Sequence, residues 1–329
     1  MAGIHRTVKA VSMAPAPYVA VVGAVNVDIW GRAQAALRPK DSNPGEIHIA
    51  LGGVGRNIAH NLRLLGTEVQ FLTVFGGDVW AGKIEESCRS LGIGLERALR
   101  IPNGRSSTYL YITGPEGELE LAVCDADIAH CITPAVLREN LDMLCGAAAV
   151  VFDGNLTQEA IQVLTEECSA PLFADPVSAA KAGKLRPFLS RIHTIKPNAL
   201  EAAVLTEEKN PCRAAEMLLQ CGVKRCFVSD GPRGMYAGDK GGVFHLPCCP
   251  VERVCNTTGS GDAVVAALVH SYLSGRSVLE GAQFALAAGA LAVECEETIN
   301  PSLSELAVLD RCTAAWHGKR WSNKYMTGE

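Results

Sequence analysis

From Tyr18 onward, short apolar runs alternate with longer stretches whose apolar residues have helical spacing. The short runs are rich in Val, Ile and Phe, and they predict buried strands at residues 18–25, 69–74, 148–152, 172–174 and 226–229. Helices are expected to begin near Gly55, Val79, Pro134, Thr157, Asn198, Pro211, Gly261 and Ser277. This alternation predicts an α/β protein, a three-layer αβα sandwich with a mostly parallel central sheet.

Two segments have a period of two instead, residues 46–51 (EIHIAL) and 107–123, and the second contains a turn signal at 114–117 (GPEG). They interrupt the units of the main sheet, so we expect a small antiparallel β lid formed by about residues 26–51 and 107–124. The lid should project from a single domain that spans residues 18–315. We expect a disordered N-terminal tail at residues 1–17 and a C-terminal tail at 316–329.

Composition narrows the class of protein. The 329 residues are 48% hydrophobic, enough for a large core, and carry a formal net charge of −5 without a long basic run. This charge balance argues against polymeric nucleic acid and anionic membranes as partners. The apolar runs, such as residues 284–293, are too short to span a membrane. Thirteen cysteines, without paired CxxC motifs, indicate reduced thiols and a cytoplasmic protein, although the acid-free N-terminal segment leaves a mitochondrial presequence open.

The sharpest motif is residues 256–262 (NTTGSGD), which precede a stretch with helical apolar spacing. Small residues before a helix leave backbone N–H groups free to face an anion, and the helix dipole favours negative charge there. Asp262 would place a carboxylate beside that anion, where a protein that only binds the anion would avoid one. We interpret Asp262 as a base for an acceptor hydroxyl. Taken alone, the stretch could also be an ordinary helix start with an N-terminal acid.

A second glycine-rich segment, residues 52–59 (GGVGRNIA), also leads into a helix. Gly52 and Gly53 would let a ligand approach the backbone, and Asn57 would face it from the first turn. A tight strand-to-helix turn is the alternative reading. Neither segment is a Walker A loop, because no Gly-Lys pair is followed by Ser or Thr, and no GxGxxG fingerprint is present.

Polar residues also stand where predicted strands end, which is the edge at which open α/β sheets bind ligands. Asn26 and Asp28 follow the first strand, Asp153 and Asn155 follow residues 148–152, and Asp175 ends the next strand. Each of these is also a common cap or turn residue.

Two further candidates lie later in the chain. Asn198 and Glu201 are three residues apart at a predicted helix start, so they could orient water ligands of Mg²⁺ around phosphates. Gly231 and Gly234 could pass under a nucleotide, or they could simply form a turn.

In their order and spacing, GGVGRN, Asn198-x-x-Glu201 and NTTGSGD resemble the two signatures and the intermediate motif of ribokinase-like (PfkB-type) carbohydrate kinases, over residues 18 to about 309. The resemblance implies ATP and Mg²⁺ as cofactors and Asp262 as the general base. It places the N–H groups of Gly259, Ser260 and Gly261 on the transferring phosphoryl group. The implied substrate contacts are Asn26, Asp28, Gly52, Gly53, Asn57 and Asn155. The implied nucleotide contacts are Asn198, Ser229, Gly231, Gly234, Thr258, Gly259 and Gly261, with Glu201 on the metal.

Asn256 departs from the family pattern, because many relatives carry Asp there. It lies near the monovalent-cation loop of such kinases, so the resemblance leaves K⁺ activation open. Within the family, residues 41–45 (DSNPG), 175–178 (DPVS), 193–198 (HTIKPN) and Asn300-Pro301 look most like pseudouridine kinases. That narrower resemblance implies phosphorylation of the 5′ hydroxyl of pseudouridine. Ser42, Asn43 and Asp125 are our candidates for contacts to the base.

Other readings stay open. A ribokinase or another nucleoside kinase of the family would use the same motifs. A non-catalytic nucleoside or sugar sensor on the same fold is more remote, because Asp262 and the anion-binding segment are intact. Relatives often pair through their lids, so the resemblance also implies a homodimer formed through the β lid.

Overall fold

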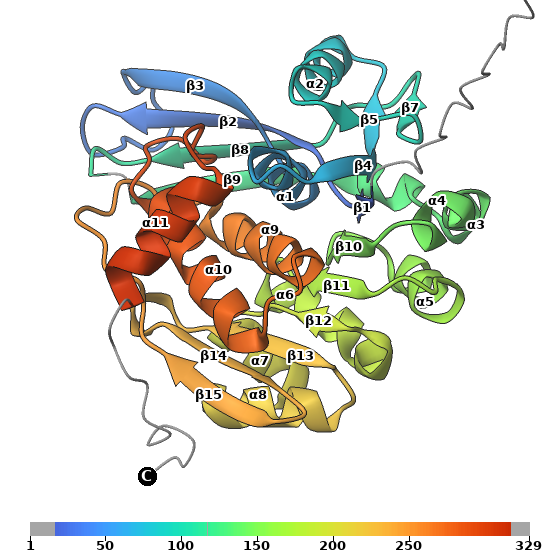
Figure 1. Cartoon of the computed structure of the whole chain (residues 1–329). Coiled ribbons are helices and arrows are strands. Elements are labelled where there is room, and N and C mark those ends of the chain that lie inside the picture. The colour runs from blue at the N-terminus through green and yellow to red at the C-terminus, as the bar shows by residue number, and fades with distance from the viewer. Residues whose placement is uncertain (1–16, 117, 317–329) are drawn as a thin grey trace, which may run out of the picture.

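A computed structural model describes residues 17–116 and 118–316 of the chain. Its centre is a nine-stranded sheet with the order β15-β14-β13-β12-β11-β10-β1-β4-β6 (Figure 1). The strands are β1 (Tyr18–Val22), β4 (Glu68–Leu72), β6 (Ile93–Gly94), β10 (Ala149–Asp153), β11 (Leu172–Asp175), β12 (Thr194–Ile195), β13 (Arg225–Ser229), β14 (Met235–Asp239) and β15 (Gly242–Leu246). All pairs from β6 to β13 are parallel, and β14 and β15 add an antiparallel edge.

Helices cover both faces of this sheet, which confirms the predicted three-layer α/β fold. One face is covered by α1 (Val54–Leu64), α2 (Val79–Ser90), α9 (Ser260–Leu273), α10 (Val278–Val293) and α11 (Glu305–Trp316). The other face is covered by α3 (Pro134–Glu139), α4 (Leu141–Cys145), α5 (Gln158–Glu167), α6 (Ala179–Ala182), α7 (Ala199–Thr206) and α8 (Pro211–Gln220). Short 3₁₀ turns are η1 (Asp127–Cys131), η2 (Gly183–Arg191) and η3 (Gly231–Arg233), and β5 (Val74–Gly76) pairs with β7 (Leu99–Ile101) apart from the main sheet.

Strand β1 shows why a sandwich forms. Val19 and Val21 belong to the apolar core on one face of the sheet, whereas Ala20 and Val22 belong to the core on the other. Because alternate side chains of a strand point to opposite faces, an apolar strand needs a cover on both sides.

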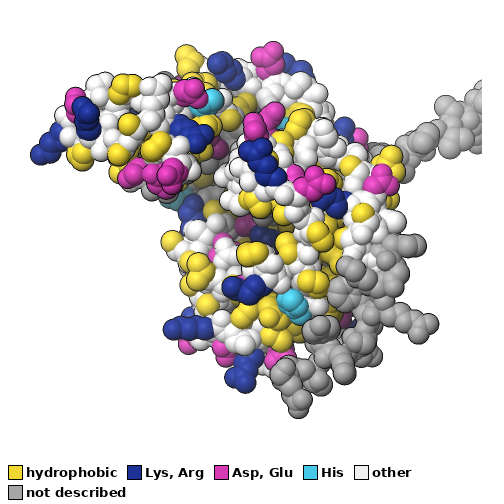
Figure 2. All heavy atoms as spheres, turned by 90° about the vertical axis from the view of Figure 1, so that its left-hand side faces the viewer, with side chains coloured by type: hydrophobic (Ala, Val, Ile, Leu, Met, Phe, Trp, Pro, Cys, Tyr) yellow, Lys and Arg dark blue, Asp and Glu magenta, His cyan; other side chains and the backbone are white. Residues whose placement is uncertain are grey.

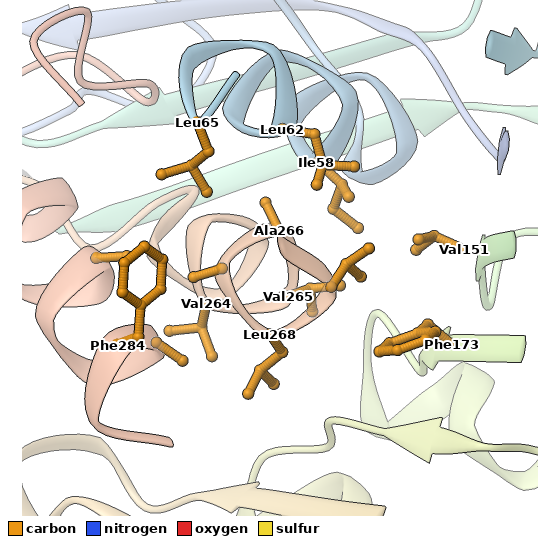
Figure 3. Close-up of a cluster of buried hydrophobic side chains, with 14 of the residues drawn as sticks. Ile58, Leu62, Leu65, Val151, Phe173, Val264, Val265, Ala266, Leu268 and Phe284 are labelled. Atoms are coloured by element: carbon orange, nitrogen blue, oxygen red, sulfur yellow. The ribbon is translucent and has the colours of Figure 1, made fainter. Parts of the chain in front are cut away.

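Helices α1 and α9 lie side by side over the sheet. Figure 3 shows Ile58 of α1 with Val265 and Ala266 of α9 in one buried cluster that also contains Val151 and Phe173 of the sheet. Fully burying an aliphatic or aromatic side chain of this size contributes about 1.5–3 kcal/mol. This packing fixes the N-terminal ends of the two helices next to each other.

The lid is a four-stranded sheet with the order β3-β2-β8-β9, built from β2 (Asn26–Ala33), β3 (Gly45–Gly52), β8 (Thr108–Thr113) and β9 (Leu119–Asp125). Both outer pairs are antiparallel as predicted, but the central pair, β2 with β8, is parallel. The lid strands project beyond the main sheet (Figure 1), and the view from that side shows a hollow beneath an overhanging upper part of the molecule (Figure 2).

Within the described residues, no helix is both long enough and apolar enough to cross a membrane. The two tails expected at residues 1–17 and 316–329 lie outside the described residues, apart from Pro17 and Trp316.

Candidate active site

The two glycine-rich motifs meet through Asn57 and Asp262. The Nδ2 of Asn57 donates a hydrogen bond of 2.8 Å to the Oδ2 of Asp262, and both side chains are buried. Asn57 lies in the first turns of α1 and Asp262 lies in the first turn of α9, so the packing of these helices sets the pair. The structure thus joins two residues that are 205 positions apart and that the sequence motifs single out separately.

Asp262 lies in a crowded acidic setting. Burial and the neighbouring carboxylate of Asp175 raise the pKa of Asp262 to about 8, with a further contribution from Asp153. The hydrogen bond from Asn57 and the charge of Lys196 act in the opposite direction. A carboxylate whose pKa lies close to neutral pH is suited to accept a proton from a substrate hydroxyl.

The start of α9 presents backbone donors beside Asp262. Gly259 has a φ of 78°, and a β-carbon there would collide with the carbonyl oxygen of Thr298, so this position requires glycine. The N–H groups in the first turn of a helix have no partner within the helix, and they favour an anion. The N–H of Ser260 makes only a long hydrogen bond of 3.4 Å, to the carbonyl of Thr257 in the preceding loop. The hydroxyl of Ser260 donates to the carbonyl of Thr257 at 2.8 Å, so its side chain is engaged locally.

Lys196 is a site residue that sequence reasoning missed. It follows β12, is buried, and its Nζ lies 3.9 Å from a carboxylate oxygen of Asp175. The same Nζ is 3.0 Å from the position that a β-carbon on Gly261 would occupy. Gly261 therefore leaves room for an ammonium group at the start of α9. In the sequence, Lys196 stands inside the segment 193–198 (HTIKPN), two positions before Asn198 and at the end of a strand too short to recognise.

Asp153 holds the ends of β1 and α1 together. Its Oδ2 accepts hydrogen bonds from the N–H groups of Ala24 at 3.0 Å and Gly55 at 3.1 Å. A β-carbon on Gly23 would collide with this carboxylate, which explains the glycine at this position. Strand β1 ends at Val22, three residues before the predicted end of the strand. Asp153 thereby positions the glycine-rich turn.

Asn155 follows β10 and takes part in the same edge of the sheet. Its N–H donates to Asp153 Oδ1 at 2.9 Å, and its Oδ1 accepts a hydrogen bond from the ammonium group of Lys181. Lys181 comes from α6, which follows the turn after Asp175, where Val177 has a φ of 70°.

Unsatisfied acceptors cluster at the base of the lid. The Oδ1 atoms of Asn26 and Asn57 are buried and have no hydrogen-bond partner among the described residues. Asp28 lies on β2 against Gly52, where a β-carbon would collide with its carboxylate, and burial raises the pKa of Asp28 to about 6. Gly53 caps α1 with a φ of 93°. Because unpaired buried acceptors are costly, this cluster is suited to a ligand rich in hydroxyl donors.

The residues expected on the nucleotide side occupy one strip of the sheet edge. Asn198 and Glu201 form a capping box, in which each side chain accepts the backbone N–H of the other at 2.8–2.9 Å. Ser229 forms a β-bridge with Asn198, and Gly231 lies just beyond it with open space around its α-carbon. Gly234 has a structural reason to be glycine, because a β-carbon there would collide with the carbonyl oxygen of Leu246.

Glu201 has a raised pKa, chiefly because it is buried, and only its Oε2 is used in the capping box. Among residues 17–116 and 118–316, no group of three His, Cys, Asp or Glu side chains could hold a metal ion by itself. The free Oε1 fits a metal held mainly by phosphate oxygens and water.

Asn256 and Thr258 shape the loop before α9. The Oδ1 of Asn256 accepts the N–H of Thr258 at 2.9 Å, and its Nδ2 donates to the carbonyl of Glu296 at 3.1 Å. An Asp at this position could not make the second bond. The amide thus ties this loop to the backbone at Glu296.

The three candidates for base contacts have local partners. Asn43 bonds to the backbone of Arg38 and Asp41, and Ser42 is exposed in the same loop. Asp125 pairs with Arg105 at 2.9 Å and lies on the lid face opposite to Asp28. The structure does not bring these residues to the face that carries Asp28.

A buried carboxylate beside free helical N–H groups, with unsatisfied acceptors nearby, is the arrangement of a phosphotransferase that acts on a hydroxyl. Residues 16–305 match the pfkB family carbohydrate kinases, and the chain belongs to this family. It is 35% identical to the pseudouridine kinase of Escherichia coli, over 87% of this chain and 94% of that protein. It is 37% identical to an uncharacterized sugar kinase of the same organism, over 87% of this chain and 81% of that protein.

Solved structures agree on the fold. The ribokinase of Thermotoga maritima superposes with a TM-score of 0.80, with 20% identity, over 90% of this chain and 99% of that one. The fold is therefore ribokinase-like. Together with the family match, this makes the protein an ATP-dependent sugar or nucleoside kinase.

Proposed function

We propose that this kinase transfers the γ-phosphoryl group of ATP to the 5′ hydroxyl of pseudouridine. The observation that carries the chemistry is the buried Asn57–Asp262 pair at the start of α9. The choice of substrate is supported by the 35% identity with a pseudouridine kinase over nearly the whole length of that protein.

In this reaction Asp262 takes the proton of the 5′ hydroxyl as that oxygen forms its bond to the γ-phosphorus. The bond between the γ-phosphorus and the β–γ bridging oxygen breaks, and ADP leaves with the electron pair. The N–H groups at Gly259, Ser260 and Gly261 and the ammonium group of Lys196 stabilise the charge on the transferring group. The Asn57 amide holds the Asp262 carboxylate in position through a hydrogen bond to its Oδ2 atom. The Oδ1 atom of Asp262 is left free to accept the proton.

The ribose hydroxyls would bind at the base of the lid. Their O–H groups would donate to the unpaired Oδ1 atoms of Asn26 and Asn57 and to the carboxylate of Asp28. The absence of a side chain at Gly52 makes room for the Asp28 carboxylate itself, and a β-carbon on Gly53 would collide with the backbone of Ala24. Asn155 lies at the same edge of the sheet, where its side-chain oxygen accepts a hydrogen bond from Lys181.

Mg²⁺ belongs to this proposal on the nucleotide side. The ion would neutralise the phosphate charge during in-line transfer. Glu201 would hold its water ligands through Oε1, and Asn198, Ser229, Gly231 and Thr258 would line the nucleotide. K⁺ is not part of the proposal.

We also propose that the protein is a cytoplasmic homodimer. All thirteen cysteines are unpaired, which suits a reducing compartment. One lid face carries exposed aliphatic side chains that a second copy could cover. These are Ile47, Ile49, Leu110, Leu121 and Val123.

The substrate is tested by competition. Pseudouridine, uridine, adenosine and D-ribose compete for limiting ATP, and the phosphorylated products are identified by mass and nuclear magnetic resonance. We expect pseudouridine to have the highest kcat/KM. If uridine, adenosine or ribose is preferred, the substrate assignment is wrong and the kinase assignment stands.

A further inference from the structure

The two faces of the lid carry different chemistry. Strand pairing places Asp28 opposite Tyr109, and Trp30 opposite both His48 and Tyr111, so these side chains share one face. We call Trp30, His48, Tyr109 and Tyr111 the aromatic face. The other face is aliphatic, with Ile29, Ile47, Ile49, Leu110 and Val123 on neighbouring strands.

The four rings form a continuous row. The ring centroids of Trp30 and His48 are 4.1 Å apart and those of Trp30 and Tyr111 are 6.1 Å apart, both with an interplanar angle of 14°. Tyr109 adjoins Tyr111 at 5.3 Å but is tilted by 35°. The three larger rings are only half-buried and His48 is exposed, so the row ends at solvent and not in the core.

The row begins at the sugar acceptors. Tyr109 is the register partner of Asp28, and the phenol pKa of Tyr111 is raised by burial and by the nearby Asp28. Asp28 in turn lies against Gly52, which leads through Gly53 into the first turns of α1 and to the Asn57–Asp262 pair. A sugar held at Asp28 with its reacting hydroxyl at Asp262 would therefore direct its other substituent along the aromatic face.

A flat heterocycle can stack along such a row with its whole face, whereas a free ribose offers only a small nonpolar C–H face between its hydroxyl groups. Aromatic rings attract one another in offset-stacked and edge-to-face arrangements, and every nucleobase has such surfaces. We propose that the aromatic face of the lid binds the base of the substrate, with Tyr109, Tyr111 and Trp30 in contact with it, and that the substrate class is nucleosides and not free sugars. This inference rests on the proposed kinase site, but it does not depend on pseudouridine being the preferred nucleoside.

The test compares nucleosides with ribose in the full-length enzyme at saturating ATP. Wild type, Tyr109→Ala, Tyr109→Phe and Trp30→Ala are assayed with pseudouridine, uridine and D-ribose. We expect kcat/KM for the nucleosides to fall roughly 5- to 150-fold in the alanine variants. This is the loss of affinity that usually follows removal of one aromatic ring stacked on a base. Tyr109→Phe should keep most of the activity, because it keeps the ring. Turnover of ribose and the KM for ATP should change little.

Cross-strand aromatic pairs also stabilise sheets, so a control must separate folding from recognition. Leu121→Ala on the aliphatic face serves as this control, because any effect of lid stability lowers all substrates alike. An equal loss for ribose and nucleosides in Tyr109→Ala and Trp30→Ala, or no loss at all, would overturn the inference. If the enzyme prefers uridine to pseudouridine and the alanine variants lose activity on uridine but not on ribose, the base-binding role of the aromatic face is supported and the pseudouridine assignment is wrong.

A binding measurement covers the case of an unfolded alanine variant. Trp30 fluorescence, taken as the difference between wild type and Trp30→Phe, should change on addition of pseudouridine or uridine and not on addition of D-ribose. Equal responses to ribose and to the nucleosides would contradict a base-binding role.

Discussion

Lys196 lies against Gly261, with its Nζ 3.0 Å from the place where a β-carbon would stand. This relationship links the end of β12 to the first turn of α9 and sets a positive charge beside the free N–H groups of that turn. A β-carbon at position 261 would be in tight contact with the ammonium group, which would have to shift by a few tenths of an ångström.

Two substitutions test this arrangement. Lys196→Met keeps most of the buried volume but removes the charge, so we expect kcat to fall by about 10² or more, as when an oxyanion-hole donor is lost. Gly261→Ala should lower kcat in the same direction by displacing the ammonium group. Steady-state kinetics with ATP varied checks both, and unchanged kcat in Lys196→Met would remove Lys196 from the site. Lys83→Met is the control, since that lysine lies over the ring of Trp80 on α2 and has no assigned role in the site.

The pH dependence follows from Asp262. Its pKa of about 8 in the free protein means that the base is mostly protonated at neutral pH. We therefore expect kcat/KM for the nucleoside to rise about tenfold per pH unit below pH 8 and to level off above it. A profile that is flat between pH 6 and 9 would contradict this environment for the base.

The same carboxyl affects stability. Its folded pKa is above its unfolded value, so the folded protein holds the extra proton between about pH 4 and pH 8, and stability from this group is lost as the pH rises through that window. Asp262→Asn removes this titration. In urea unfolding, the free energy of unfolding of the variant should therefore increase relative to that of the wild type from pH 6 to pH 9. A constant difference across this range would show that Asp262 does not titrate there.

Glu201 has two roles to separate, a cap and a metal contact. Gln can still accept the N–H of Asn198, so Glu201→Gln should fold normally and raise the half-saturating Mg²⁺ concentration more than it weakens nucleoside binding. Glu201→Ala loses the cap as well and should destabilise the protein by about 0.5–2 kcal/mol. Metal titrations decide the point, and an unchanged Mg²⁺ requirement in Glu201→Gln would assign the residue to capping alone.

Much of this site could be predicted from the sequence. Asn57, Asp262 and the glycines around them lie where small residues precede a helical apolar pattern, and that pattern predicts an anion-binding helix start. Lys196 could not be, because its role depends on a two-residue strand and on the absence of a side chain at Gly261. The parallel pairing of β2 with β8 could not be predicted from the local sequence either. The alternation of apolar and polar residues shows which side chains share a face of a strand, but it does not show which strand lies next to it. Strands β6 and β12 have only two residues, too few for any period.

The proposed dimer through the aliphatic face of the lid can be tested by measuring the molecular mass in solution. The aliphatic face should be buried in a dimer, because Ile47 and Leu121 are otherwise 76% and 60% exposed. Light scattering at micromolar concentration should give twice the 34.8 kDa of one chain, and Ile49→Lys should reduce it to one chain. A wild-type mass near that of one chain would rule out the dimer.

The central claim is that Asp262 is the base. The most direct measurement is the single-turnover rate of phosphoryl transfer in Asp262→Asn, with ATP affinity and the unfolding curve measured alongside and Asp125→Asn as an exposed acidic control. Asn preserves the contact with Asn57, so we expect intact folding and ATP binding with a rate about 10² to 10⁴ lower than wild type. Phosphorylation by Asp262→Asn at close to the wild-type rate would contradict the account.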